Sequence, residues 1–176
     1  ENWFSGTLSL LHAGRDATIQ KGLEYYEILN QRAALTPYEK RYSSLPRAIE
    51  WRLELPEYRY VIIELMMSDM ESFIEESTYY EAKAEYEATS TVLALLRRHK
   101  EIGQYPAQLD DLVKDGYLKT LPRDPYAAGA LSYKRFDDGF MLYSLGDDFD
   151  DDGGMETSEP MKRKLQGSDW VFWPIN

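Results

Sequence analysis

The acidic stretch Gly139–Pro160, which reads GFMLYSLGDDFDDDGGMETSEP, constrains this chain more than any other feature. A β-like run from Phe140 to Tyr143 leads through Gly146 into a group of carboxylates that matches the twelve-residue pattern D-x-[DN]-x-[DN]-G-x5-E. Carboxylates at alternate positions converge on one point, the glycine allows a sharp turn, and the last acid completes a shell of hard oxygen ligands. The residues at the pattern positions are Asp148, Asp150, Asp152, Gly153 and Glu159. The spacing therefore predicts a calcium site.

The flanks of this loop differ from those of an EF-hand. Tyr143–Gly146 is typical of a strand end, and Pro160 is a poor start for a helix leaving the loop. We therefore expect a calcium loop set on a sheet, with Met155 at its eighth position anchoring it to the core. A solvated acidic surface loop is the alternative interpretation. Charge alone requires neither the alternating carboxylates nor the glycine, so the pattern favours ligation.

The negative charge of the chain is concentrated in this region. The formal net charge is −11, and nine acidic residues and no basic residue lie between Asp137 and Glu159. The other residues carry 22 acids (31 − 9) against 20 bases, which is close to balance. Local acidity of this kind indicates a cation site. We do not expect nucleic acid as a partner, because no basic stripe is present to neutralise phosphates. Without cysteine, the chain has neither disulfides nor thiolate chemistry.

Helical patterns fill the first hundred residues. Apolar residues at helical spacing predict a helix from Asp16 to about Leu35, with Ile19, Leu23, Tyr26 and Leu29 on one face. A largely buried helix is expected over Tyr58–Ile74, with its methionines as core filler. A longer helix is expected from about Thr78 to Ile102 and ends at Gly103. Its expected buried face consists of Ala82, Tyr86, Thr89, Leu93 and Leu96, with Val92 and Leu95 beside it.

The second half of the chain changes to short elements. We expect a short helix over Ala107–Val113, a hairpin of Leu131–Phe136 with Gly139–Leu145, and a third strand at Asp169–Trp173. The predicted fold class is α+β, in which N-terminal helices, including a long one, pack on a small three-stranded antiparallel sheet that carries the calcium loop. Residues 1–76 form the predicted helical region and residues 77–176 the α+β domain.

An ordered set of short motifs extends from the long helix to the acidic loop. The set comprises Gly103-Gln104-Tyr105-Pro106, Leu109 to Val113, Gly116-Tyr117-Leu118, Leu121-Pro122-Arg123-Asp124-Pro125-Tyr126, Leu142-Tyr143-Ser144-Leu145-Gly146, Asp148 and Gly153-Gly154. In this order the motifs resemble the C-terminal part of the major pseudopilin of type II secretion systems, over about half of the chain. The resemblance implies calcium ligation by the Leu145 carbonyl, the Asp148 carboxylate and an acid further along the loop. The family's Trp-Gly-Asn after Asp-Pro is replaced here by Tyr126-Ala127-Ala128-Gly129.

Spacing and resemblance together define the predicted site and function. The predicted calcium ligands are Leu145, Asp148, Asp150 and Asp152, joined by Glu156 or Glu159. We expect a non-enzymatic, calcium-stabilised module outside the cytoplasm, in the periplasm or at the cell surface, with other envelope or secretion-system proteins as partners. No apolar run approaches the roughly 18 residues of a membrane helix, so any membrane contact is expected through an anchor upstream of Glu1. The alternatives are a carboxylate-dependent hydrolase and a polysaccharide-binding protein of the cell envelope.

Overall fold

The computed structural model describes residues 13–47, 50–51, 55, 59–60, 77–155 and 168–174. The chain divides into two compact units, one of Glu1–Leu35 with Lys40–Glu76 and one of Thr36–Glu39 with Ser77–Asn176. Helices accompany a single three-stranded antiparallel sheet in the described part, which confirms the predicted α+β class. The methionine-rich helix expected over Tyr58–Ile74 lies almost wholly outside the described residues. No helix of the described ranges is both long enough and apolar enough to span a membrane.

Helix α2 of the first unit spans Arg15–Ala33, close to the predicted bounds. Its buried side chains are Tyr25 and Leu29, one turn apart, and the Tyr25 ring packs on Trp51 with centroids 5.4 Å apart. The predicted buried face is therefore wrong except at Leu29. Its other three members, Ile19, Leu23 and Tyr26, are exposed.

The short helix α3, Pro37–Tyr42, begins with a capping box that the sequence encodes locally. The Thr36 hydroxyl accepts the Glu39 N–H at 3.2 Å, and the Glu39 carboxylate accepts the Thr36 N–H at 2.8 Å. These reciprocal bonds satisfy two donors that a helix start otherwise leaves unpaired. The Tyr38 N–H donates to the Pro125 carbonyl at 3.1 Å, a contact within the second unit, to which Thr36–Glu39 belong.

Helix α7, Ser77–Ile102, is the long helix of the second unit, and it presents small side chains to the interior. The fully buried positions Ala84, Ala88, Thr91 and Leu95 recur at intervals of four, three and four residues, so they form one stripe. The predicted face is wrong at Ala82, Tyr86, Thr89 and Leu93, which are exposed. It is confirmed at Leu95, which is buried, and at Val92 and Leu96, which pack against the core. Tyr86 and Leu93 are 71% and 63% exposed. Small residues are favoured at the buried positions because they let the helix approach neighbouring elements closely, which a tyrosine at the same position would prevent.

Three strands form the sheet in the order β1-β2-β3: β1 is Ser132–Arg135, β2 is Phe140–Ser144 and β3 is Trp170–Trp173. Both pairs are antiparallel, with Arg135 opposite Phe140 and Ser144 opposite Trp170. The predicted hairpin turn is present, and the Phe136 N–H donates to the Gly139 carbonyl. The β2–β3 register shifts between Leu142 and Tyr143. Central strand β2 is the most buried, since it lies between two neighbours and below α7.

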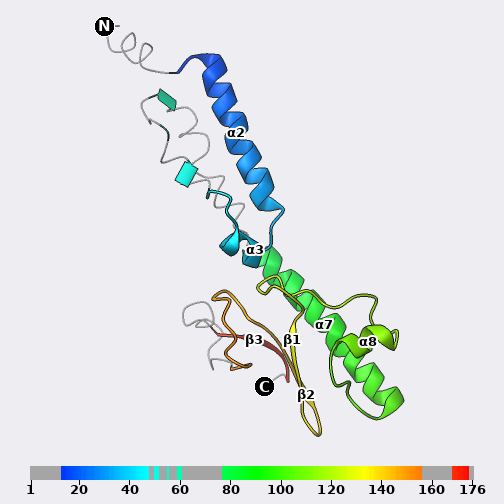
Figure 1. Cartoon of the computed structure of the whole chain (residues 1–176). Coiled ribbons are helices and arrows are strands. Elements are labelled where there is room, and N and C mark those ends of the chain that lie inside the picture. The colour runs from blue at the N-terminus through cyan, green and yellow to red at the C-terminus, as the bar shows by residue number, and fades with distance from the viewer. Residues whose placement is uncertain are drawn as a thin grey trace. The chain divides into compact units, whose positions relative to one another are not determined.

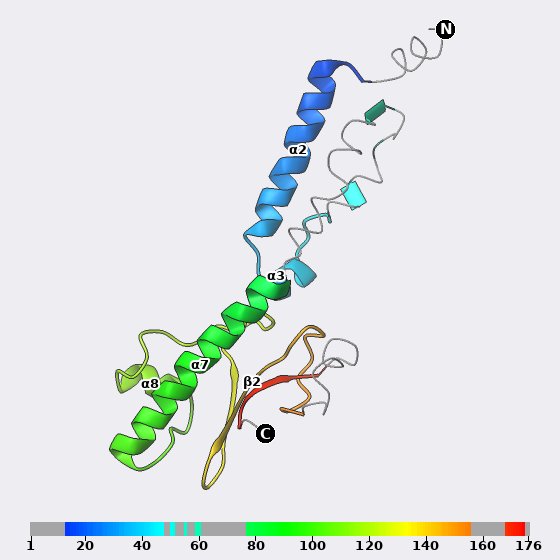
Figure 2. The ribbon, with the colours of Figure 1, turned by 180° about the vertical axis from the view of Figure 1, so that it is seen from behind.

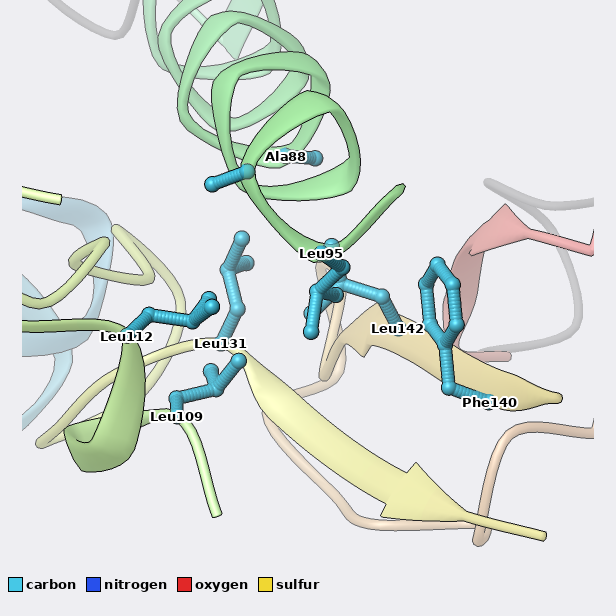
Figure 3. Close-up of a cluster of buried hydrophobic side chains, with 8 residues drawn as sticks. Ala88, Leu95, Leu109, Leu112, Leu131, Phe140 and Leu142 are labelled. Carbon is cyan, nitrogen blue, oxygen red and sulfur yellow. The ribbon is translucent and has the colours of Figure 1, made fainter. Parts of the chain in front are cut away.

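The core of the second unit lies between α7, the sheet and the short helix α8, Asp110–Lys114. Figures 1 and 2, which view the ribbon from opposite sides, show α7 running beside the strands. In the close-up of Figure 3, Ala88 and Leu95 come from α7, Leu109 and Leu112 from the α8 region, and Phe140 and Leu142 from β2. This core positions the far end of β2, where the acidic loop begins.

Candidate metal site

A buried carboxylate fixes the start of the acidic loop. Asp124 is 3% exposed, and its Oδ1 accepts hydrogen bonds from Ser144 Oγ at 2.7 Å and from the Tyr126 N–H at 2.9 Å. Its Oδ2 accepts the Leu145 N–H at 3.1 Å. Burial raises the pKa of Asp124, although these donors act in the opposite direction. Asp124 therefore orients the peptide of Leu145, the residue whose carbonyl is predicted to bind calcium.

Gly146 makes the turn out of β2. Its φ is +73°, and a Cβ at this position would lie 2.8 Å from the Ser168 carbonyl oxygen and 3.0 Å from the Trp170 indole nitrogen. Only glycine combines this conformation with so close an approach. The turn closes through a hydrogen bond from the Phe149 N–H to the Gly146 carbonyl. As a result, the loop folds back against the segment that precedes β3.

Phe149, and not Met155, anchors the acidic loop. Met155 is 66% exposed, so the predicted anchor is wrong. Phe149 has a φ of +65°, which is unusual for a bulky side chain, and its ring packs with Tyr38 and Tyr126. Tyr126 in turn meets Trp170 of β3 edge to face at 4.6 Å. The aromatic contacts hold the middle of the loop and leave the neighbouring aspartates at the surface.

Three loop aspartates are engaged in the turn itself. Asp148 Oδ1 accepts the Asp150 N–H at 3.2 Å, and Asp150 Oδ1 accepts the Asp151 N–H at 3.0 Å. Asp151 Oδ1 accepts both the Gly153 N–H and the Tyr143 hydroxyl, each at 2.9 Å. Lys134 Nζ donates to the Gly153 carbonyl at 2.8 Å and lies 5.2 Å from the Tyr143 ring centroid. A lysine from β1 therefore reaches an otherwise acidic loop.

Asp169 is the residue that the sequence analysis missed. It precedes β3, it is fully buried, and its Oδ2 accepts the Gly154 N–H at 2.6 Å. Its other oxygen, Oδ1, is buried and has no hydrogen-bond partner among the described residues. A buried, unpaired carboxylate oxygen is costly unless a cation or a donor meets it. Figures 1 and 2 show the loop, in orange, folding back beside the red segment that holds Asp169.

The electrostatics of Asp169 connect it with the loop. Burial, which is the largest cause, and the negative charges of Asp151, Asp152 and Asp148 together raise its pKa to about 6, against a lowering by the Gly154 N–H. Three aspartates of the loop thus act on a carboxylate that follows them by 17 or more residues. No local pattern in the sequence signals this meeting, because only the pairing of β3 with β2 brings Asp169 to the loop.

The predicted ligands fall into three groups. The charges of Asp148 and Asp152 raise the pKa of Asp169, whereas Asp150 is exposed and accepts a hydrogen bond within the turn. Leu145 lies at the turn, held through its N–H. Glu156 and Glu159 lie outside the described residues. Among the residues that the structure describes, no group of three or more acidic, histidine or cysteine side chains is arranged so that it could hold a metal ion.

A second feature lies at the opposite end of β2. A cavity of about 210 Å³ opens between the end of α7 and the β1–β2 hairpin. The His99 ring stacks on Tyr105 with centroids 4.3 Å apart, and Arg135 donates to the Tyr105 carbonyl at 3.3 Å. These contacts explain His99 as part of the packing at the helix end. The lining residues are His99, Gly103, Gln104, Tyr105, Arg135, Phe136 and Asp137.

Comparisons with protein-family models, curated proteins and solved structures gave no match for this chain.

Proposed function

We propose that residues 77–176 form a non-enzymatic, calcium-stabilised structural and interaction module that works outside the cytoplasm, similar in design to a pseudopilin. The observation that carries the proposal is the buried Asp169 Oδ1, which has no hydrogen-bond partner among the described residues, on a carboxylate whose pKa the charges of Asp148, Asp151 and Asp152 raise. Calcium prefers carboxylate and carbonyl oxygens, which are the donors that this region offers. A bound cation would replace mutual repulsion among these groups by attraction.

Asp148, Asp152 and Asp169 are the proposed carboxylate ligands, with the Leu145 carbonyl and one of Glu156 and Glu159 completing the shell. Asp169 replaces Asp150 in the set predicted from spacing, because Asp150 is exposed. The hydrogen bonds of Asp124 support this assignment, because they orient the Leu145 peptide through its N–H and involve none of the proposed carboxylate ligands. Calcium then joins the end of β2 to the start of β3, so its role is structural.

An extracellular or periplasmic setting suits such a site. Extracytoplasmic calcium reaches millimolar concentrations, which saturate loops with dissociation constants of roughly 10⁻⁴–10⁻³ M. The expected partners are other proteins of the cell envelope or of a secretion system.

Calorimetric titration of the chelator-treated full chain with calcium tests the proposal. The wild type should bind one calcium with a dissociation constant in the range above, and its melting temperature should rise with calcium. Asp169→Asn should weaken binding at least tenfold. Asp138→Asn, an exposed acid in the hairpin turn, is the matched control and should bind as the wild type does. No heat and no melting shift in the wild type at millimolar calcium would refute the site.

A further inference from the structure

Helix α7 carries a second apolar stripe on the side away from its buried face. This exposed stripe, here called the heptad stripe, consists of Tyr79, Ala82, Tyr86, Thr89 and Leu93. Its three large members, Tyr79, Tyr86 and Leu93, are 56%, 71% and 63% exposed. At about 100° per residue, the stripe lies nearly opposite the buried positions Ala84, Ala88, Thr91 and Leu95. Helix α7 is therefore apolar on two sides, and the fold of the second unit uses one of them.

The spacing of the heptad stripe is that of a helix–helix seam. Successive members are three, four, three and four residues apart, which is the a/d repeat by which one helix packs along another. Single exposed apolar side chains are ordinary on protein surfaces, but an aligned row of them marks an interaction surface. A partner that follows this row over two heptads is itself a helix.

We propose that the heptad stripe pairs with the same stripe of a second copy of this chain, with the two α7 helices antiparallel. In this orientation, each position of the stripe in one copy, extended by Leu96, lies opposite a position of the stripe in the other copy. Ala82 then faces Leu93 of the second copy and Tyr86 faces Thr89, so two of the large side chains meet small ones. Tyr79 faces Leu96, which is half-buried against the core of its own unit. A parallel pair would instead place Tyr86 against Tyr86 and Ala82 against Ala82, which gives alternate crowding and gaps.

Charge along α7 favours the same orientation. The half before Ala88 has three glutamates and one lysine, and the last turns have three cations and one glutamate, so the two halves have opposite sign; the residues are Glu81, Lys83, Glu85, Glu87, Arg97, Arg98, Lys100 and Glu101. The ion pair of Arg98 with Asp115 reduces the positive end without reversing it. An antiparallel pair aligns opposite halves and opposite helix dipoles, whereas a parallel pair aligns like with like.

The side chains beside the seam are compatible with this pairing. Lys83 and Glu85 flank Tyr86, and in the antiparallel pair they face Ser90 and Val92 of the second copy, so no like charges meet. The row contains only three large side chains, a few hundred Å² of apolar surface, against about 800 Å² per partner in a standard interface. The dimer should therefore be weak and reversible, with a dissociation constant on the order of 10⁻⁵ M.

Cysteine cross-linking of the full chain tests the orientation, because the natural sequence contains no cysteine. The Ala82→Cys and Leu93→Cys proteins are prepared separately. Each protein alone, and a mixture of the two, is treated with a short bifunctional maleimide, both in calcium and in chelator. The antiparallel pair predicts a strong cross-link in the mixture and little in either protein alone. Efficient linking of Ala82→Cys to itself would overturn the proposal in favour of a parallel pair, and no linking above the level of a Tyr42→Cys control would also overturn it.

Sedimentation equilibrium of the full chain supplies the second measurement. The wild type should associate at concentrations near 10⁻⁵ M, and the double variant Tyr86→Glu/Leu93→Glu should weaken association at least tenfold. Phe136→Glu, at a 51% exposed ring in the hairpin, is the control and should associate like the wild type. Circular dichroism confirms that the variants keep their helix. Unchanged association of the double variant, or equal loss in the control, would overturn the proposal.

Discussion

Ser144 Oγ donates a 2.7 Å hydrogen bond to Asp124 Oδ1, and this buried contact joins two segments 20 residues apart in the sequence. Because Asp124 also accepts the N–H groups of Tyr126 and Leu145, one carboxylate defines both the proline-rich turn and the exit from β2. This contact fixes the point at which the acidic loop leaves β2.

Replacing Asp124 by asparagine should destabilise the second unit. The amide group turns one acceptor into a donor, so a buried N–H or hydroxyl loses its partner at a cost of about 1–3 kcal/mol. Urea unfolding followed by tryptophan fluorescence measures the change. Asp138→Asn in the exposed hairpin turn should alter the free energy of unfolding by less than about 0.5 kcal/mol. Equal effects at both positions would contradict the structural role of Asp124.

Asp169→Asn should raise the melting temperature in chelator and reduce the increase that calcium produces. In chelator at pH 7 the variant should melt at a higher temperature than the wild type, because it removes a buried charge that three aspartates repel. In millimolar calcium the variant should gain less than the wild type, because it lacks a ligand. Thermal melts of both proteins in both conditions decide the matter; a lower melting temperature of the variant in chelator would contradict the electrostatic argument.

The pH dependence in chelator follows from the same residue. The pKa of Asp169 is about 6 in the folded protein, above the usual aspartate value of 3.8. The folded state therefore holds a proton that the unfolded state has lost between these values, and stability from this group falls as pH rises through 6. The difference between wild type and Asp169→Asn should widen from pH 4 to pH 7. A constant difference across that range would count against the raised pKa.

Gly146→Ala should be among the most damaging single-methyl changes in the chain. The new Cβ would meet the Ser168 carbonyl at 2.8 Å in a left-handed conformation, and a cost of about 2–4 kcal/mol is expected. Gly139→Ala is the matched control, since no atom lies within 4 Å of its Cβ position and its φ is not positive. Denaturant unfolding of the two variants compares them directly.

Phe149→Ala should loosen the acidic loop by removing its contacts with Tyr38 and Tyr126. We expect a loss of about 1–2 kcal/mol and weaker calcium binding, measured by chemical unfolding and calorimetry. Met155→Ala, at the exposed position first expected to anchor the loop, should have little effect on either quantity. The reverse order of effects would restore Met155 as the anchor.

The local signals of this sequence determine much of the secondary structure. Gly103 ends α7 with a φ of +85° and the Asp-Asp-Gly turn closes the hairpin, as predicted. Thr36 and Glu39 encode the start of α3 by an equally local signal, which the prediction from sequence did not use. Each depends on residues within a few positions of one another, so the sequence is sufficient to predict them.

Tertiary structure decides which of two possible faces of α7 is buried. Both the Ala84-containing stripe and the heptad stripe recur at helical spacing, and hydrophobicity favours the tyrosines and leucine of the latter. The interior of the second unit has room for small side chains at these positions, so the alanine stripe packs and the tyrosines remain outside. Periodicity identifies a face, but the closeness of the partner elements selects it.

The candidate metal site divides in the same way. The sequence by itself determined where the acids gather, because alternating aspartates and Gly153 are a local pattern. Only the folded chain shows which acids influence one another, since antiparallel pairing of β3 with β2 brings Asp169, 21 residues after Asp148, within electrostatic reach of the loop. The physical reason is that ligand spacing is read along the chain, whereas charge and burial act through space.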